Sequence, residues 1–240
     1  MEYINLNIGI QARSTSERFP GKVFAQIDDH TLLEKVIDAC EKSAFYINRH
    51  NHKSRVMVNV SLLIPKGDPI LKAIKKRVLI IEGDEHDVLS RYMTLMHKTN
   101  SDYIVRITGD CPMIPPPLIT KAIKTTLMNH YDYFSNVDED LRISLDGDDV
   151  EVISSKALTW LGENAKDPKD REHVTTLIRR EPPEWAKMGH LFGYYDFSNT
   201  PKRSVDTEED LERVRAISAE IDKKIKKCEK KYGKGSAHRF

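Results

Sequence analysis

The chain has 240 residues, of which 39% are hydrophobic and 31% are charged, and its formal net charge at pH 7 is +1. This length and composition fit a globular protein with one large domain, and the balanced charge excludes a protein-wide field that would attract nucleic acid or a membrane surface. The three cysteines have no metal-ligand or disulfide spacing, and no run of about 20 apolar residues is present. We therefore expect a cytoplasmic protein with neither a membrane nor a nucleic-acid partner.

The first 130 residues alternate between strand-like and helix-like patterns. Apolar residues at every second position predict a strand over 3–10, and the capping-box spacing of Thr31 and Glu34 predicts a helix over 31–43. Further strands are expected over 55–64, 77–83 and 102–110, and further helices over 68–76, 86–99 and 116–128. This alternation predicts an α/β fold with a mostly parallel sheet, in which ligands bind beyond the carboxyl ends of the strands.

The pattern is looser after residue 130. Strands are expected over 131–137, 148–154 and 192–198, and helices over 155–165, 170–181 and 206–227, with a polar end that frays from residue 228. We interpret 1–220 as a single domain. Within it, residues 1–130 form a nucleotide-binding half, and 131–200 form an elaboration that closes over the site and contributes to dimerisation. Residues 221–240 form a polar tail.

A basic segment follows the first predicted strand. "QARSTSERFPGKV", residues 11–23, carries Arg13, Arg18 and Lys22 among small residues and a Pro-Gly turn. Such a loop offers charge and backbone N–H donors to phosphates, although a solvated surface loop would have the same composition. It is not a Walker-type loop, because Ser16 replaces the first glycine of that motif and Val23 follows the lysine.

Two aspartates stand where a hard cation could be held. Asp110 ends the strand in "VRITGDCP", and Asp206 precedes the helix in "RSVDTEEDL". Mg²⁺ is usually bound by one or two carboxylates together with substrate phosphates. A turn residue and a helix cap are the plainer interpretations, and Thr207 with Asp210 already accounts for the capping pattern. The sequence alone does not bring the two carboxylates together.

Three further segments are rich in charge. Arg91 lies in "EGDEHDVLSRY", Glu151 in "LDGDDVEVIS", and Arg171, Glu172 and His173 in "DREHVT". Each also fits an ordinary solvated helix end or hairpin loop.

These segments, in this order, closely resemble the SpsF-type (spore coat polysaccharide biosynthesis protein F) cytidylyltransferases, which are related to the CMP-Kdo and CMP-sialate synthetases. The resemblance extends from about Ile8 to Ile217. It implies a three-layer α/β/α sandwich with a mostly parallel mixed sheet, the GT-A-like nucleotide-diphospho-sugar transferase fold. It also implies a Mg²⁺-dependent transfer of CMP from CTP to a small acceptor with release of pyrophosphate, for surface-polysaccharide synthesis, by a homodimer.

The resemblance also implies roles for particular residues. The nucleotide would be bound by Gln11, Ala12, Arg13, Arg18, Lys22, Arg91 and Asp110. Catalysis would depend on Arg13, Lys22, Asp110 and Asp206, with Asp110 and Asp206 as the metal ligands. The acceptor would face Glu151, Arg171, Glu172 and His173.

The acceptor itself stays open at this point. A keto-sugar acid would give a CMP-sugar, and a phosphomonoester would give a CDP-compound. The family typically has a leucine where this chain has Asp148, and an extra anion there would repel an anionic acceptor or attract a cationic group. Two other functions remain as alternatives: a GT-A glycosyltransferase that uses a nucleotide sugar, and a non-catalytic nucleotide-binding relative. "GDCP" lacks the second aspartate of the DxD motif that glycosyltransferases favour.

Overall fold

A single mixed sheet organises the molecule. The computed structural model describes residues 3–50, 55–74, 78–137, 145–191 and 200–233. Within them, seven strands lie in the order β5-β4-β1-β6-β8-β7-β9, and every pairing is parallel except those of β8 with β6 and β7. The strands are β1 (Ile4–Gln11), β4 (Val56–Pro65), β5 (Leu79–Gly83), β6 (Tyr103–Thr108), β7 (Tyr133–Ser135), β8 (Glu151–Ser154) and β9 (Met188–His190), beside a separate ladder of β2 (Gln26–Ile27) and β3 (His30–Thr31).

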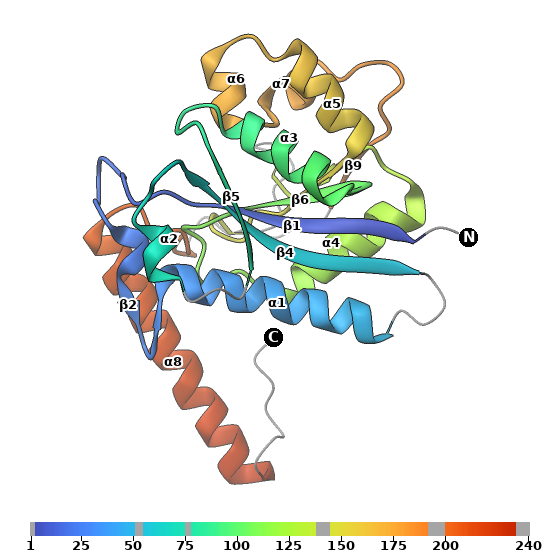
Figure 1. Cartoon of the computed structure of the whole chain (residues 1–240). Coiled ribbons are helices and arrows are strands. Elements are labelled where there is room, and N and C mark those ends of the chain that lie inside the picture. The colour runs from blue at the N-terminus through green and yellow to red at the C-terminus, as the bar shows by residue number, and fades with distance from the viewer. Residues whose placement is uncertain (1–2, 51–54, 75–77, 138–144, 192–199, 234–240) are drawn as a thin grey trace.

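Helices cover both faces of this sheet (Figure 1). One face carries α1 (Leu32–His50) and α4 (Pro116–Asn129), and the other carries α3 (Val88–Thr99) with α5 (Ser155–Asn164) packed beside it. The remaining helices are η1 (Lys22–Phe24), α2 (Ile70–Ala73), α6 (Pro168–His173), α7 (Thr176–Arg180) and α8 (Glu208–Tyr232). The predicted three-layer α/β/α sandwich with a mostly parallel mixed sheet is confirmed.

The period-two pattern of the strands explains the two cores. Leu6, Ile8 and Ile10 of β1 are fully buried in the cluster shared with α1 and α4. Ile104 of β6 and Ile153 of β8 are buried in the second cluster, which is shared with α3 and α5. Burying apolar side chains on both faces fixes the strand register, because a slip of one residue would exchange the faces.

The carboxyl ends of the central strands meet at one edge of the sheet. Gln11 at the end of β1 pairs with Leu63 of β4 and Thr108 of β6. The basic segment 11–23 leaves from this edge, and Asp110 follows β6 two residues beyond its end. The fold therefore brings these two predicted site segments together at the place where α/β sheets bind ligands.

Several of the predicted elements differ in the structure. The helix expected over 31–43 continues to His50 as α1. The helix expected over 170–181 is interrupted between α6 and α7, where Val174 has φ 65°. A β-branched residue avoids this left-handed region unless its surroundings impose it, so the periodic pattern could not reveal the break. The chain was expected to fray from residue 228, but α8 continues to Tyr232, with Glu220 and Lys224 forming an i,i+4 pair along it.

Two strands also differ. β8 begins at Glu151 rather than at residue 148, after a turn at 146–147 and three residues without regular structure, and β9 (Met188–His190) was not expected. The strand expected over 192–198 lies outside the described residues. In the part of the chain that the structure describes, no helix has the length and apolar character needed to cross a membrane.

Gly147 provides a test of how closely the turn at 146–147 packs against the backbone of Arg203 and Ser204. Its φ is +99°, and a Cβ at this position would lie 2.2 Å from the Ser204 backbone nitrogen. We expect Gly147→Ala to lower the free energy of unfolding by about 2 kcal/mol or more, measured by urea denaturation. Gly67→Ala is the matched control, because Gly67 has φ +75° but open space around it, and backbone strain alone costs about 1–2 kcal/mol. Equal losses in the two variants would contradict the close packing.

Candidate active site

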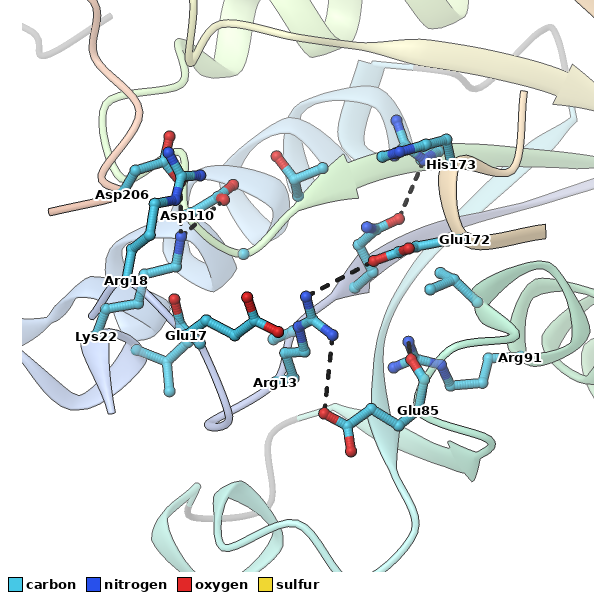
Figure 2. A pocket seen from close by; sticks show the side chains of 18 residues that line it. Arg13, Glu17, Arg18, Lys22, Glu85, Arg91, Asp110, Glu172, His173 and Asp206 are labelled. Carbon is cyan, nitrogen blue, oxygen red and sulfur yellow. Dashed lines mark hydrogen bonds and ion pairs between the residues drawn. The ribbon is translucent and has the colours of Figure 1, made fainter. Parts of the chain in front are cut away.

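Two carboxylates from distant parts of the chain converge on one ammonium group. Lys22 Nζ lies 3.1 Å from Asp110 Oδ2 and 3.2 Å from Asp206 Oδ1, and it donates a 2.7 Å hydrogen bond to the Val205 carbonyl oxygen. The Val205 N–H in turn donates to the Asp110 carbonyl oxygen at 2.9 Å. The structure therefore places the two predicted metal ligands side by side, with the predicted catalytic lysine between them (Figure 2).

The start of α8 fixes the position of Asp206. Thr207 and Asp210 form a capping box, and the Asp206 N–H donates to Asp210 Oδ2 at 2.9 Å. Burial by itself would raise the pKa of Asp206, but Lys22, with help from Lys202, holds that pKa below its ordinary value. The capping interpretation of Thr207 and Asp210 is thus correct, and it leaves the Asp206 side chain directed to Lys22.

The acidic turn at residues 146–148 holds the segment that carries Asp206. The Arg203 N–H donates to the Asp146 carbonyl oxygen at 2.6 Å, and the Arg203 guanidinium pairs with Asp148 at 3.2 Å. Asp148 is buried. Asp148 is not among the residues that line the cavity described below, and its charge is compensated by Arg203, so nothing in this geometry supports a direct effect of the extra anion on the acceptor.

The other cations of the basic segment also face carboxylates. Arg18 pairs with Asp206 at 3.0 Å while its side chain is 67% exposed. The Arg13 guanidinium lies between Glu85 and Glu172, at 3.7 Å from each (Figure 2). Arg13 thereby links the basic segment to the loop after β5 and to α6.

These side chains line a cavity of about 650 Å³, a size typical of small-molecule sites. Ten of the sequence-predicted site residues line it, and Glu151 and Arg171 do not. The ten are Gln11, Ala12, Arg13, Arg18, Lys22, Arg91, Asp110, Glu172, His173 and Asp206.

Glu151 is buried beneath the cavity. Its carboxylate pairs with Arg106 and accepts hydrogen bonds from the Tyr133 hydroxyl at 2.6 Å and the Thr175 hydroxyl at 2.5 Å. Burial by itself would raise the pKa of Glu151, but these three partners hold it below its ordinary value. Glu151 therefore acts in this structure as the anchor of Arg106, which does line the cavity.

Arg171 is also held away from the cavity. Its Nε and one terminal nitrogen both donate to Asp87 Oδ2, at 2.8 and 2.7 Å, and its other terminal nitrogen donates to the Ala165 carbonyl oxygen. Asp87 caps α3, so Arg171 ties α6 to the start of α3. The neighbouring Glu172 and His173 are thereby presented to the cavity.

Arg91 joins β4 to the loop after β5 at the cavity wall. One terminal nitrogen donates to the Leu63 carbonyl oxygen at 3.0 Å and the other to that of Glu85 at 3.4 Å. Arg91 is buried, and burial lowers the pKa of its guanidinium. Its Nε is buried without a hydrogen-bond partner among the described residues.

Sequence reasoning did not assign five polar residues of the cavity: Ser16, Glu17, Glu85, Arg106 and Thr108. The first two lie in the basic segment, and the acidic residues around Glu85 fit an ordinary helix start. Arg106 and Thr108 lie in β6, and a cation within an otherwise apolar strand was the available signal. Such a residue must find a buried partner, and the sequence does not identify Glu151 as that partner.

The donor set at Asp110 and Asp206 fits a divalent cation bound together with a nucleotide. The described residues contain no group of three or more His, Cys, Asp or Glu side chains arranged to hold a metal by themselves. Mg²⁺ needs fewer protein ligands, because it is commonly bound by one or two carboxylates with phosphate oxygens and water. Both carboxylates already face a single cation, the Lys22 ammonium.

Comparison with known proteins gives a consistent result. A family model described as cytidylyltransferase matches residues 8–232. The spore coat polysaccharide biosynthesis protein SpsF of Bacillus subtilis is 29% identical over 219 residues, which cover 87% of this chain and 84% of that protein. A cytidylyltransferase structure from Leptospira borgpetersenii has a TM-score of 0.78 at 25% identity, covering 98% of this chain and 100% of that one. The CMP:2-keto-3-deoxy-manno-octonic acid synthetase complexed with CTP shares the fold, with a TM-score of 0.60 at 16% identity over 90% of this chain and 99% of that one.

The buried pair of Glu151 and Arg106 predicts a pH-dependent loss of stability. We expect Glu151→Gln to lower the free energy of unfolding at pH 7 by about 3–5 kcal/mol, because it leaves a buried guanidinium without its counter-ion. The folded pKa of Glu151 lies below its unfolded value, so its contribution is present above the unfolded pKa and is lost as the pH falls through the folded one. The difference between wild type and variant should therefore shrink below about pH 4.

Urea denaturation between pH 3 and pH 7 measures this difference. Glu163→Gln is the matched control, since Glu163 is exposed on α5, and it should change stability by less than about 0.5 kcal/mol at every pH. A pH-independent effect of Glu151→Gln would contradict an ionised Glu151.

Proposed function

The chain belongs to the cytidylyltransferase family, and we propose that it transfers CMP from CTP to a small acceptor used in surface-polysaccharide synthesis, with release of pyrophosphate. The observation that carries this proposal is the convergence of Asp110 and Asp206 on Lys22 at one end of the cavity, where Arg18 also pairs with Asp206, while Arg13 lies further along the same cavity. This end has the charges that a nucleoside triphosphate with its cation requires. Membership of the family favours a nucleotidyltransferase over the glycosyltransferase alternative.

The reaction needs alignment and charge compensation more than covalent help from the protein. An acceptor oxygen attacks the α-phosphorus of CTP, the new O–P bond forms, and the bond from the α-phosphorus to the bridging oxygen breaks as pyrophosphate leaves. Negative charge develops on the pyrophosphate, and we assign its stabilisation to Arg13, Arg18 and Lys22. Asp110 and Asp206 would hold Mg²⁺, which when bound neutralises phosphate charge.

Arg13 must exchange partners for this role. It lies between Glu85 and Glu172, 3.7 Å from each, and these distances are long for charge-assisted hydrogen bonds. A phosphate oxygen therefore competes with two loose contacts. We assign Ala12 and Gln11 to the nucleoside side of the cavity, together with Arg91.

We place the acceptor near Glu172 and His173, which line the cavity on α6. We favour a sugar acid as the acceptor, because relatives at 25–26% identity are 3-deoxy-manno-octulosonate cytidylyltransferases, and the relation to SpsF supports a polysaccharide pathway. Glu151 and Arg171 belong to this proposal as positioning residues, since both have partners outside the cavity. A homodimer and a cytoplasmic location complete the proposal, and the free thiols Cys40, Cys111 and Cys228 fit a reducing compartment.

Nucleotide titration is the first test. We expect isothermal titration calorimetry to detect CTP binding in the presence of Mg²⁺, weaker binding in EDTA, and much weaker binding of ATP, GTP and UTP. Acceptors are then screened by pyrophosphate release with CTP, with keto-deoxy sugar acids and sugar phosphates as the two panels. Absence of binding to every nucleoside triphosphate would overturn the proposed function.

The two aspartates give a sharper test once an acceptor is found. We expect Asp110→Asn and Asp206→Asn each to reduce kcat/KM by at least about 10²-fold, because each removes a charge that the bound cation requires. Both variants should also lose the Mg²⁺ dependence of CTP binding. Asp29→Asn, at an exposed position, is the control and should be indistinguishable from wild type. Full activity in both site variants would remove the metal assignment.

A further inference from the structure

The carboxamide of Gln11 is held in one orientation at the end of β1. Gln11 lines the cavity, and Arg106 Nε donates a 3.0 Å hydrogen bond to Gln11 Oε1. An arginine side chain has only donors, so the carboxamide must turn its oxygen to Arg106. A flipped amide would bring two donors face to face.

This orientation leaves the amino group of Gln11 for another partner. The Tyr92 hydroxyl also lies 3.4 Å from Oε1, but its proton has a better acceptor in the Gly9 carbonyl oxygen at 3.0 Å. Among the residues that the structure describes, none accepts a hydrogen bond from Gln11 Nε2. Two N–H donors therefore remain on a side chain of the cavity wall.

Arg106 cannot turn away to release the carboxamide. Its guanidinium is paired with the buried Glu151, which Tyr133 and Thr175 hold through their hydroxyl groups. Leaving this pair would strand a buried carboxylate without its counter-ion, which costs several kcal/mol. The chain of contacts from Thr175 through Glu151 and Arg106 thus fixes Gln11 as a donor towards the cavity.

A fixed donor distinguishes the two pyrimidine bases. Cytosine presents lone pairs at both N3 and O2, whereas uracil carries an N–H at position 3. The amino group of Gln11, which cannot exchange places with its carbonyl oxygen, can donate to N3 of cytosine. In uracil the same amino group would face the N–H at position 3, and two donors left unpaired in a binding site are strongly disfavoured. Lys22, Arg18, Asp110 and Asp206 lie together at one end of the cavity, and Arg13 lies between that end and Arg91 (Figure 2). We therefore place the base at the far end, on the Arg91 side, where Gln11 lies 3.4 Å from the hydroxyl of Tyr92, the neighbour of Arg91 on α3.

We propose that Gln11, oriented by Arg106, is the residue that selects cytosine over uracil. This inference rests on the proposed function, because it assumes that a nucleoside triphosphate occupies the cavity. It gives Gln11, which the family resemblance places along the nucleotide, the specific task of selecting the base, and it explains why a buried ion pair lies next to the end of β1.

The test compares CTP and UTP binding in wild type and Gln11→Glu by isothermal titration calorimetry with Mg²⁺. The glutamate keeps an oxygen for Arg106 and replaces the amino group by an acceptor, which suits the uracil N–H. The added negative charge weakens both triphosphates alike, so the ratio of the two dissociation constants isolates the base. We expect the preference for CTP to fall by about tenfold or more.

Two further variants complete the experiment. Gln26→Glu makes the same charge change at the other glutamine of the chain, which is exposed, and its CTP preference should equal that of wild type. Gln11→Met removes the donor without adding charge, and it should lower the preference by about fivefold. Circular dichroism tests whether each variant is folded. If Gln11→Glu does not fold, the CTP preference of Gln11→Met tests the role of Gln11.

The outcomes separate this inference from the proposed function. Selective CTP binding by wild type with an unchanged preference in Gln11→Glu and Gln11→Met overturns the role of Gln11 and leaves the function standing. Absence of CTP binding by wild type overturns both. A reduced preference in the Gln11 variants alone, with Gln26→Glu unaffected, supports the assignment.

Discussion

The Lys22 ammonium compensates two carboxylates that the fold forces together, and the geometry of the site depends on this contact. Asp110 follows a central strand and Asp206 precedes the last helix, so their proximity to each other is not set by their neighbours in sequence. Two adjacent carboxylates repel each other when no cation lies nearby. The Lys22 ammonium offsets this repulsion. The hydrogen bond from the Val205 N–H to the Asp110 carbonyl oxygen holds the two aspartate segments next to each other. The turn at Gly147 and the pair of Asp148 with Arg203 then hold the Asp206 segment against the sheet.

A second, buried network stabilises the opposite part of the cavity. The network consists of Glu151, Arg106, Tyr133 and Thr175. The Glu151 carboxylate carries its negative charge, and the three partners hold the pKa of that carboxyl below its ordinary value. β8, which carries Glu151, is antiparallel to β6, and Glu151 is the register partner of Arg106. Arg106 can therefore pair with Glu151 while its Nε reaches Gln11 on β1. The reversal of one strand in an otherwise parallel sheet thus has a direct consequence for the shape and polarity of the site.

Local patterns in the sequence predicted the elements that build the sheet, because strand and helix periods depend on neighbouring residues. They also located the basic segment and Asp110 at the functional edge, since that follows from the alternation of strands and helices. They could not show that Asp206 meets Asp110, because this contact depends on the docking of residues 202–206 on the turn at Gly147. The acceptor-side role of Glu151 came from the family resemblance, and local patterns could not test it, because a charged residue in a strand looks exposed until its buried partner is known. The break at Val174 could not be predicted either, because no local helical signal marks it. It accompanies a long-range contact, the hydrogen bond from Thr175 to Glu151.

The charge balance of the cavity constrains how a nucleotide can bind there. Among the described residues that line it, five carry a positive charge and five a negative charge. The summed charge of these side chains therefore gives no net attraction to a triphosphate. Affinity must come from local exchange of partners. Arg13 is the side chain best placed for this, because its two contacts to Glu85 and Glu172 are long and partly exposed, and solvent-exposed pairs of this kind contribute little. Arg106, in contrast, is bound to a buried carboxylate and stays in place. The cavity therefore combines two kinds of cation. Arg13 can exchange its partners for a phosphate, as binding of a phosphate chain requires, and Arg106 is fixed firmly enough to orient the Gln11 carboxamide, as recognition of a base requires.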